Sequence, residues 1–567
     1  MGNRFRLDRN HIRITLRYGR DRKKTVRQTC QWPRGASVTA IELLPATLLL
    51  KGEKDILTGL IQSAEEIYLR SLTMSLRLRE VPGERLCVSG PPGPFLALSE
   101  RNSGETIMFA RKQPVRQIIS YRYDPAGKKI RIRWDFNCLL PVEAEKNLDG
   151  VYIRTGARDS LRSRYSRGIL KHNTQLPEKT PLSGWMTPAD PGRGYPLKKL
   201  EETLTLLERE KIWFNLICLD ELHPVPGDWL NVRKDYQGKL GSLTRRIEHN
   251  RMIPGLRFSP LAVSPDSDLF RTRQDWLLRD FRGEPLTLNG RKRKPGSCFL
   301  DFTRDDVKEY LRGILETFRN QWGFRAFHLK GLEVLTAGYR REEMEQEGGL
   351  LLSAALRFFR ENIGRDDLLV AEGGSLLASA GTVNIHRDSR RQPQSPGESI
   401  RYFRKALPGI LDHSLMQKTF WIYDPGCYPA GSAAEEWPMQ IRESLRQVIL
   451  LTGGHLSVRD ELTGYSKEQI SELRRTLESF GKFRTGMLTL LSCPDAIRPV
   501  LLYNSAGYLG VFNLSRRKKS ISLDLKSLEE QLGIRKTASL MREGRTGLRT
   551  GTLDLILPPY GSRIFEF

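Results

Sequence analysis

Cysteine is scarce and isolated in this 567-residue chain. No C-x-x-C pair occurs and the total is odd, so the pattern indicates neither a disulfide framework nor a zinc site. Single thiols are typical of a cytoplasmic protein, which is the location we predict, and we expect no metal and no cofactor. The seven positions are Cys30, Cys87, Cys138, Cys218, Cys298, Cys427 and Cys493.

Long apolar runs are also missing. The best candidate for a membrane span, IELLPATLLL at residues 41–50, is short and is broken by Pro45, whereas a transmembrane helix needs about 20 apolar residues. The first residues place Arg every few positions and leave no apolar core for a secretory signal. We therefore expect no membrane association.

Acidic residues are outnumbered by basic ones. There are 92 Lys and Arg against 66 Asp and Glu, a formal net charge of +26, and such a balance attracts polyanions. However, the basic runs are spread along the chain at residues 22–24, 291–294 and 516–519, and no zinc finger, RNA-recognition or helix-turn-helix signature accompanies them. The charge therefore predicts a solvated basic surface, and a nucleic-acid-binding protein is the third and least favoured interpretation of this sequence.

The length implies two to four domains. Residues 1–180 show short alternating runs and a hairpin signal around DPAG at 124–127, which predict a β-sandwich. Over 181–495, eight strand-like segments alternate with helix-like ones, as in a parallel (β/α)8 TIM barrel. Residues 496–567 return to alternation. The predicted fold is a multidomain α/β protein with an N-terminal β-sandwich, a central TIM barrel and a C-terminal antiparallel β-domain.

Several barrel motifs occur in a characteristic order: SGW (183–185), LDE (219–221), GDW (227–229), GLRFSP (255–260), SPDSDLF (264–270), YDPGC (423–427) and TGGHLSVRDEL (452–462). In this order they resemble the melibiase-type α-galactosidases of glycoside hydrolase family 36, and the resemblance covers residues ~183–567. It implies retaining hydrolysis of terminal α-galactosides by an Asp nucleophile on the fourth barrel strand and an Asp acid/base on the sixth. Retention requires the two carboxyl groups to lie about 5 to 5.5 Å apart.

Both implied catalytic positions are altered in this chain. The fourth strand ends His-Leu-Lys-Gly-Leu-Glu at 328–333. A match on its Lys places Leu332 at the nucleophile position, whereas a shift of one residue places Glu333 there. At the sixth strand, a gap-free match places Arg391 at the acid/base position, and a loop shortened by three residues places Asp388 there. The candidate catalytic residues are therefore Glu333 and Asp388.

The positions that would bind the sugar are better kept. Carboxylates accept hydrogen bonds from sugar hydroxyls, and an aromatic ring suits the apolar face of a sugar. By resemblance, the predicted substrate-binding residues are Asp220, Glu221, Asp228, Trp229, Lys330 and Arg387. Arg390 and Arg391, beside the sixth strand, raise the hypothesis of a carboxylated or phosphorylated sugar.

Two functions stay open on the sequence. The first is an α-galactosidase-like glycoside hydrolase that retains configuration if it is active and takes an oligosaccharide or glycoside as its substrate. The second is a catalytically degenerate barrel that binds a sugar or a protein partner without hydrolysis. A homo-oligomer is possible in either case.

Overall fold

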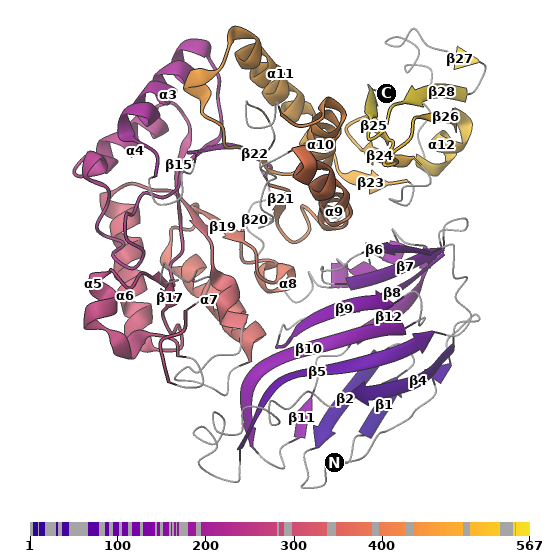
Figure 1. Ribbon diagram of the computed structural model, residues 1–567, viewed down its shortest axis with the longest axis horizontal. Helices are drawn as coiled ribbons and strands as arrows, with labels where there is room; N and C mark the ends of the chain where they lie inside the picture. Colours follow the sequence, from indigo (N-terminus) through magenta and orange to yellow (C-terminus); the bar gives the residue numbers. More distant parts are fainter. Residues whose placement is uncertain are drawn as a thin grey trace.

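The structure is a computed structural model. It describes residues 180–188, 194–279, 283–287, 297–336, 347–387, 396–414, 416–426, 436–491, 499–532, 548–549 and 552–566, single positions between them, and the N-terminal strands with short segments beside them. Along the chain, antiparallel strands come first, a parallel barrel follows, and small antiparallel sheets complete the fold (Figure 1).

The N-terminal strands form two antiparallel sheets, the predicted β-sandwich (Figure 1). One sheet has the order β1-β2-β12-β8-β7-β6, with β11 beside β2, and the other has the order β3-β4-β5-β10-β9. The expected hairpin is confirmed, since β9 and β10 pair antiparallel from Asp124 and Lys129. The strands are β1 (Arg4–Asp8), β2 (His11–Arg17), β3 (Cys30–Gln31), β4 (Ser37–Leu44), β5 (Glu66–Leu78), β6 (Leu86–Ser89), β7 (Phe95–Glu100), β8 (Glu105–Arg111), β9 (Ile118–Asp124), β10 (Lys129–Pro141), β11 (Glu145–Asn147) and β12 (Val151–Ala157).

The central region is the predicted barrel. All eight expected strands are present, and they pair in parallel in the order β21-β20-β19-β18-β15-β14-β13-β22. Most of their residues are buried, as in parallel sheets that helices cover. The strands are β13 (Ser183–Met186), β14 (Leu216–Leu219), β15 (Ile253–Phe258), β18 (Ala326–Leu329), β19 (Leu368–Glu372), β20 (Ile385–Arg387), β21 (Ile422–Asp424) and β22 (Leu456–Val458).

The surrounding helices follow from apolar residues at helical spacing. In α3, for example, Leu200, Leu204 and Leu207 are fully buried on one face. Ser466 begins α11 with a capping box to Gln469. The barrel helices are α3 (Leu197–Glu210), α4 (Leu240–His249), α6 (Asp305–Glu316), α7 (Gly348–Asn362), α9 (Pro396–Ser414), α10 (Met439–Thr452) and α11 (Lys467–Phe483), with shorter α5 (Asp268–Thr272) and α8 (Leu376–Ser379) and the strand pair β16 (Ala262–Val263) and β17 (Cys298–Phe299).

The C-terminal region contains two antiparallel sheets and one helix that the sequence did not lead us to expect. β23 (Leu488–Leu490), β24 (Val500–Asn504), β25 (Tyr508–Phe512) and β29 (Ser562–Glu566) form one sheet, and β26 (Lys519–Asp524), β28 (Thr552–Leu557) and β27 (Leu548–Arg549) form the other, with α12 (Leu525–Leu532) beside β26. Because β23 pairs with β24, the first sheet begins before the predicted boundary at 496.

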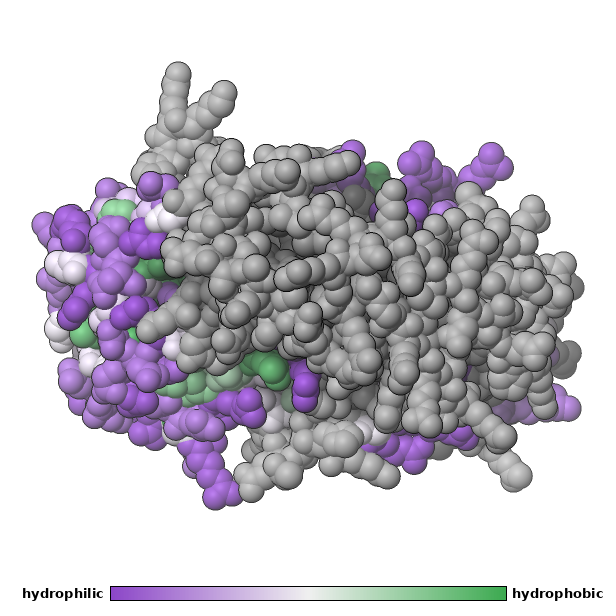
Figure 2. Space-filling view, turned by 90° about the horizontal axis from the view of Figure 1, so that it is seen from below, coloured by the Kyte–Doolittle hydropathy of each residue, from purple (hydrophilic) through white to green (hydrophobic). Residues whose placement is uncertain are grey.

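The described surface is mainly hydrophilic on the face shown in Figure 2. Large exposed apolar side chains are scattered along the chain, at Trp213, Leu230, Met439, Met487 and Ile556. Among the helices that the structure describes, none combines the length and the hydropathy needed to span a membrane.

Candidate functional site

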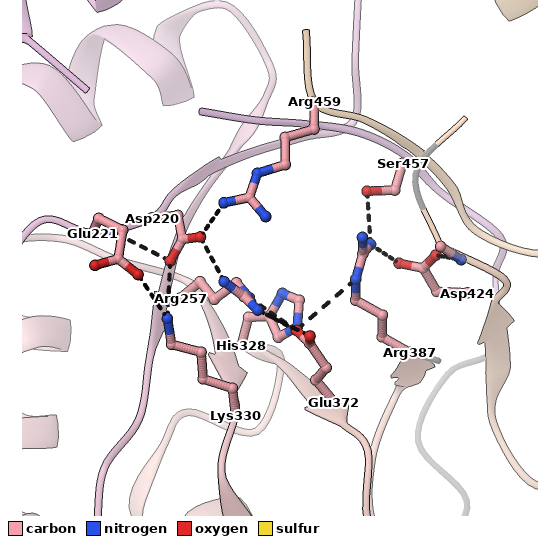
Figure 3. A network of polar contacts seen from close by, with 11 residues as sticks. Asp220, Glu221, Arg257, His328, Lys330, Glu372, Arg387, Asp424, Ser457 and Arg459 are labelled. Carbon is pink, nitrogen blue, oxygen red and sulfur yellow. Dashed lines mark hydrogen bonds and ion pairs between the residues drawn. The ribbon is translucent and has the colours of Figure 1, made fainter. Parts of the chain in front are cut away.

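A network of charged side chains occupies the carboxyl ends of the barrel strands (Figure 3). We call it the mouth network. Each member is contributed by the last residues of a barrel strand or by the residue or two after it, and in parallel barrels these ends meet at one mouth, where active sites are built. Its members are Asp220 and Glu221 after β14, Arg257 on β15, His328 and Lys330 at β18, Glu372 on β19, Arg387 on β20, Asp424 on β21, and Ser457 and Arg459 at β22.

Asp220 is the most enclosed carboxylate of the mouth network, with no exposed side-chain surface. Its Oδ2 accepts hydrogen bonds from Nη1 of Arg257 at 2.5 Å and from Nη2 of Arg459. Its Oδ1 accepts from the backbone N–H of Glu221 at 3.0 Å and lies 3.6 Å from Nζ of Lys330. Burial alone would raise the pKa of Asp220, but the surrounding cations outweigh it and hold the pKa below its usual value.

Glu372 forms the second centre of the mouth network. Arg257 donates to it from Nε and Nη2, both at 2.9 Å, in the bidentate geometry that suits a guanidinium and a carboxylate. Nε2 of His328 lies 3.0 Å from Oε2 of Glu372. Burial opposes ionisation of Glu372, but His328, Arg257 and Arg387 lower its pKa far below the usual range. Burial also lowers the pKa of His328 to about 4, so its imidazole is neutral at pH 7.

Arg387 links the network to the last two strands. Its Nη1 donates to Oδ2 of Asp424 at 2.7 Å and to the hydroxyl of Ser457 at 2.9 Å, and its Nε lies 3.9 Å from Glu372. Oδ1 of Asp424 accepts from the backbone N–H of Gly426 at 2.8 Å. Four cations and four carboxylates therefore balance across the mouth, counting Arg257, Lys330, Arg387 and Arg459 against Asp220, Glu221, Glu372 and Asp424.

The structure divides the predicted binding residues into two groups. Asp220, Glu221, Lys330 and Arg387 all belong to the mouth network. Asp228 and Trp229 do not contact that network within the described part of the chain, so a sugar-binding role for them stays a prediction.

The contacts that these two residues do make are structural. The Asp228 carboxylate accepts from the backbone N–H groups of Asp268 and Leu269, where α5 begins. The Trp229 ring is buried and packs against the rings of Phe258 and His223.

Of the two candidate catalytic residues, Glu333 is not a member of the mouth network and Asp388 lies outside the described residues. Glu333 lies in a 3₁₀ turn over Leu332–Thr336, directly after β18, and its side chain is exposed. Leu332, which occupies the nucleophile position in the other alignment, is buried. Asp388, Arg390 and Arg391 lie outside the described residues, so the Glu333–Asp388 pair stays a prediction.

Sequence reasoning missed six members of the network: Arg257, His328, Glu372, Asp424, Ser457 and Arg459. A usable signal was present, because each is a polar residue at the carboxyl end of a buried strand. Their partners could not be inferred, since the partners come from strands far apart in sequence. Among the described residues, no group of three or more His, Cys, Asp or Glu side chains is arranged to hold a metal ion.

Comparison with known proteins gives a family match in the barrel. Residues 211–326 match the family model described as Melibiase. Over 96 residues the chain is 32% identical to α-galactosidase AgaA of Geobacillus stearothermophilus, a match that covers 17% of this chain and 12% of that protein. A bifunctional α-galactosidase/sucrose kinase, AgaSK of Mediterraneibacter gnavus, is 30% identical over 83 residues, 15% of this chain and 8% of that one. The matched segments thus span about a tenth of these curated relatives.

Solved structures resemble the chain over a greater length. The α-galactosidase TtGalA of Thermus thermophilus, in complex with p-nitrophenyl α-D-galactopyranoside, has a TM-score of 0.57 and 16% identity, and the alignment covers 85% of this chain and 98% of that one. AgaA of G. stearothermophilus, a GH36 α-galactosidase in complex with raffinose, has a TM-score of 0.55 and 13% identity. The alignment covers 94% of this chain and 76% of that one. At these identities the structural likeness establishes the fold.

The fold and the site together define a multidomain (β/α)8-barrel protein with its polar centre at the carboxyl ends of the strands. Within that class, the resemblance inferred from the sequence is confirmed. The barrel resembles the melibiase family in sequence over residues 211–326, and its fold is similar to that of the GH36 α-galactosidase AgaA.

Proposed function

We propose that this protein is an α-galactosidase-like glycoside hydrolase that binds a terminal α-linked sugar at the barrel mouth. The main support is that Asp220, Lys330 and Arg387, which occupy family positions on three different strands, converge in one polar network. The relatives named above are α-galactosidases, and two of them were solved with α-galactosides bound.

In a retaining reaction, the Glu333 carboxylate would attack the anomeric carbon while Asp388 donates a proton to the departing glycosidic oxygen. Water would then attack the glycosyl-enzyme ester, with Asp388 accepting the proton, to release the sugar and restore both carboxyl groups. The exposure of Glu333 leaves it accessible to a substrate.

One observation favours a second candidate, sugar binding without hydrolysis. The match on Lys330 places buried Leu332 where the family has its nucleophile. The carboxylates of the mouth network are held by cations of the same network, so none of them is free to act as the nucleophile. A non-hydrolytic protein would keep the fold and the polar mouth and lose only the chemistry.

Release of nitrophenol from aryl α-glycosides tests the first candidate. We expect turnover by the full chain, loss of turnover in Glu333→Gln, and wild-type turnover in Glu361→Gln, a matched control at an exposed Glu on α7. Equal activity of the two variants would rule out Glu333 as nucleophile. No turnover together with measurable sugar binding by calorimetry would establish the second candidate, and the absence of both would refute the proposed function.

We also propose a cytoplasmic location. Cys218 and Cys298, whose side chains the structure describes, are buried free thiols. Burial raises the pKa of Cys218 to about 12, so it stays protonated and unreactive. Such thiols suit a reducing compartment.

A further inference from the structure

The enclosed acceptors of the mouth network, on Asp220 and Glu372, are already used by the protein itself. A carboxylate offers about four acceptor positions. Asp220 accepts three hydrogen bonds, from Arg257, Arg459 and the Glu221 backbone, and its Oδ1 also lies 3.6 Å from Nζ of Lys330. The oxygens of Glu372 accept two hydrogen bonds from Arg257, and one of them also faces His328.

Donors, in contrast, remain available. Arg459 donates a hydrogen bond to Asp220 from Nη2 only, and within the described part of the chain its Nε and Nη1 have no partner. In Figure 3 the other arm of this guanidinium points toward the space between Arg257 and Arg387. The Arg459 side chain is 23% exposed and that of Lys330 is 27% exposed, so a ligand can reach both.

The occupied acceptors and the available donors together determine which ligand group fits the mouth network. A sugar hydroxyl accepts a hydrogen bond but also has a proton to donate, and a donor buried without an acceptor costs free energy. An oxyanion only accepts, and a guanidinium offers it two parallel N–H groups. Because the charges of the network balance, an anion that reaches Arg459 meets no excess of negative charge.

Resting on the proposed sugar-binding function, we propose that the barrel mouth selects a sugar that carries an oxyanion, a carboxylate, phosphate or sulfate group, with Arg459 as its main contact and Lys330 as its second. The proposal stands on different residues from the sequence-based hypothesis about Arg390 and Arg391. It specifies the substrate class of the proposed site.

Calorimetric titration of the full chain at low salt tests the proposal, with galactose, galacturonic acid, galactose 6-phosphate and inorganic phosphate as the probes. We expect at least one acidic sugar to bind tenfold or more tightly than galactose, and the preference to weaken with added salt. Arg459→Gln should reduce that preference about tenfold, Lys330→Gln should reduce it less, and Arg459→Lys should restore part of it. Arg209→Gln, at an exposed position on α3, should leave it unchanged.

Each other outcome overturns the proposal in a recognisable way. If galactose binds as tightly as both acidic sugars, or if folded Arg459→Gln and Lys330→Gln variants keep the full preference, the oxyanion is not recognised here. If inorganic phosphate binds as tightly as galactose 6-phosphate, the site recognises the anion and not the sugar. If no sugar binds, both this inference and the proposed function fail, whereas a preference for galactose removes the inference alone.

Discussion

Replacing Arg257 by Met should destabilise the barrel strongly. The guanidinium is only 11% exposed, and it links two carboxylates that come from different strands, Asp220 at 2.5 Å and Glu372 at 2.9 Å. Met keeps most of the aliphatic stem and removes the charge, so the variant isolates the electrostatic contribution.

The size of the effect follows from what each carboxylate retains. Removing one partner of a buried ion pair costs about 3–5 kcal/mol because a buried charge is left uncompensated. Asp220 still has Arg459 and Lys330, and Glu372 still has His328 at 3.0 Å. We therefore expect the free energy of unfolding to decrease by about 3 kcal/mol, the lower end of this range. At about 2 °C per kcal/mol for a domain of this size, the melting transition should fall by about 6 °C.

Differential scanning calorimetry at pH 7 measures the shift, with exposed Arg245→Met on α4 as the matched control. The control should lie within about 0.5 kcal/mol of wild type. The double variant Arg257→Met with Glu372→Leu should recover part of the loss, since it removes one of the uncompensated charges. If Arg257→Met melts within 2 °C of Arg245→Met, the network does not stabilise the barrel as argued.

Three further outcomes are expected. Burial lowers the pKa of His328 from about 6.5 in the unfolded chain to about 4. The unfolded state therefore binds more protons between these two pH values, so the stability of the fold should decrease as the pH drops from about 6.5 to about 4. His328→Phe should flatten the pH dependence of the melting temperature, and an equally steep profile would contradict the assignment. Ser466→Ala removes the capping box of α11 and should cost about 1 kcal/mol in urea unfolding, while Ser471→Ala inside the same helix should be nearly neutral. Gly331 follows Lys330 with φ of +79°, so Gly331→Ala should cost about 1–2 kcal/mol and weaken sugar binding, and unchanged stability would show that the turn relaxes freely.

Much of the barrel could be predicted because its signals are local. Runs such as residues 214–219 and 326–329 are mostly apolar, short and separated by helical patterns, and alternation of this kind leads to a parallel sheet. All eight strands were found in this way. Local spacing does not determine how α6 begins. Thr303 and Asp306 have capping-box spacing, but Arg304 precedes the helix without a side-chain cap and the Thr303 hydroxyl donates to Asp301 instead.

The candidate site was only partly predictable. Resemblance to a family pointed to Asp220, Lys330 and Arg387, and the structure brings all three into one network. It did not identify Arg257, Arg459 or Glu372 as site residues. The pairs Arg257–Glu372 and Arg459–Asp220 each join residues more than 100 positions apart in the chain.

The sequence by itself determined the order of strands and helices, the melibiase-type motifs and the excess of basic charge. Only the tertiary structure decided how that charge is used at the mouth. An ion pair depends on distance in space, and the barrel brings the ends of β14, β15, β19 and β22 together, where Arg257 and Arg459 occupy acceptors on Asp220 and Glu372. The same arginines would be unremarkable solvated charges if these strands did not meet.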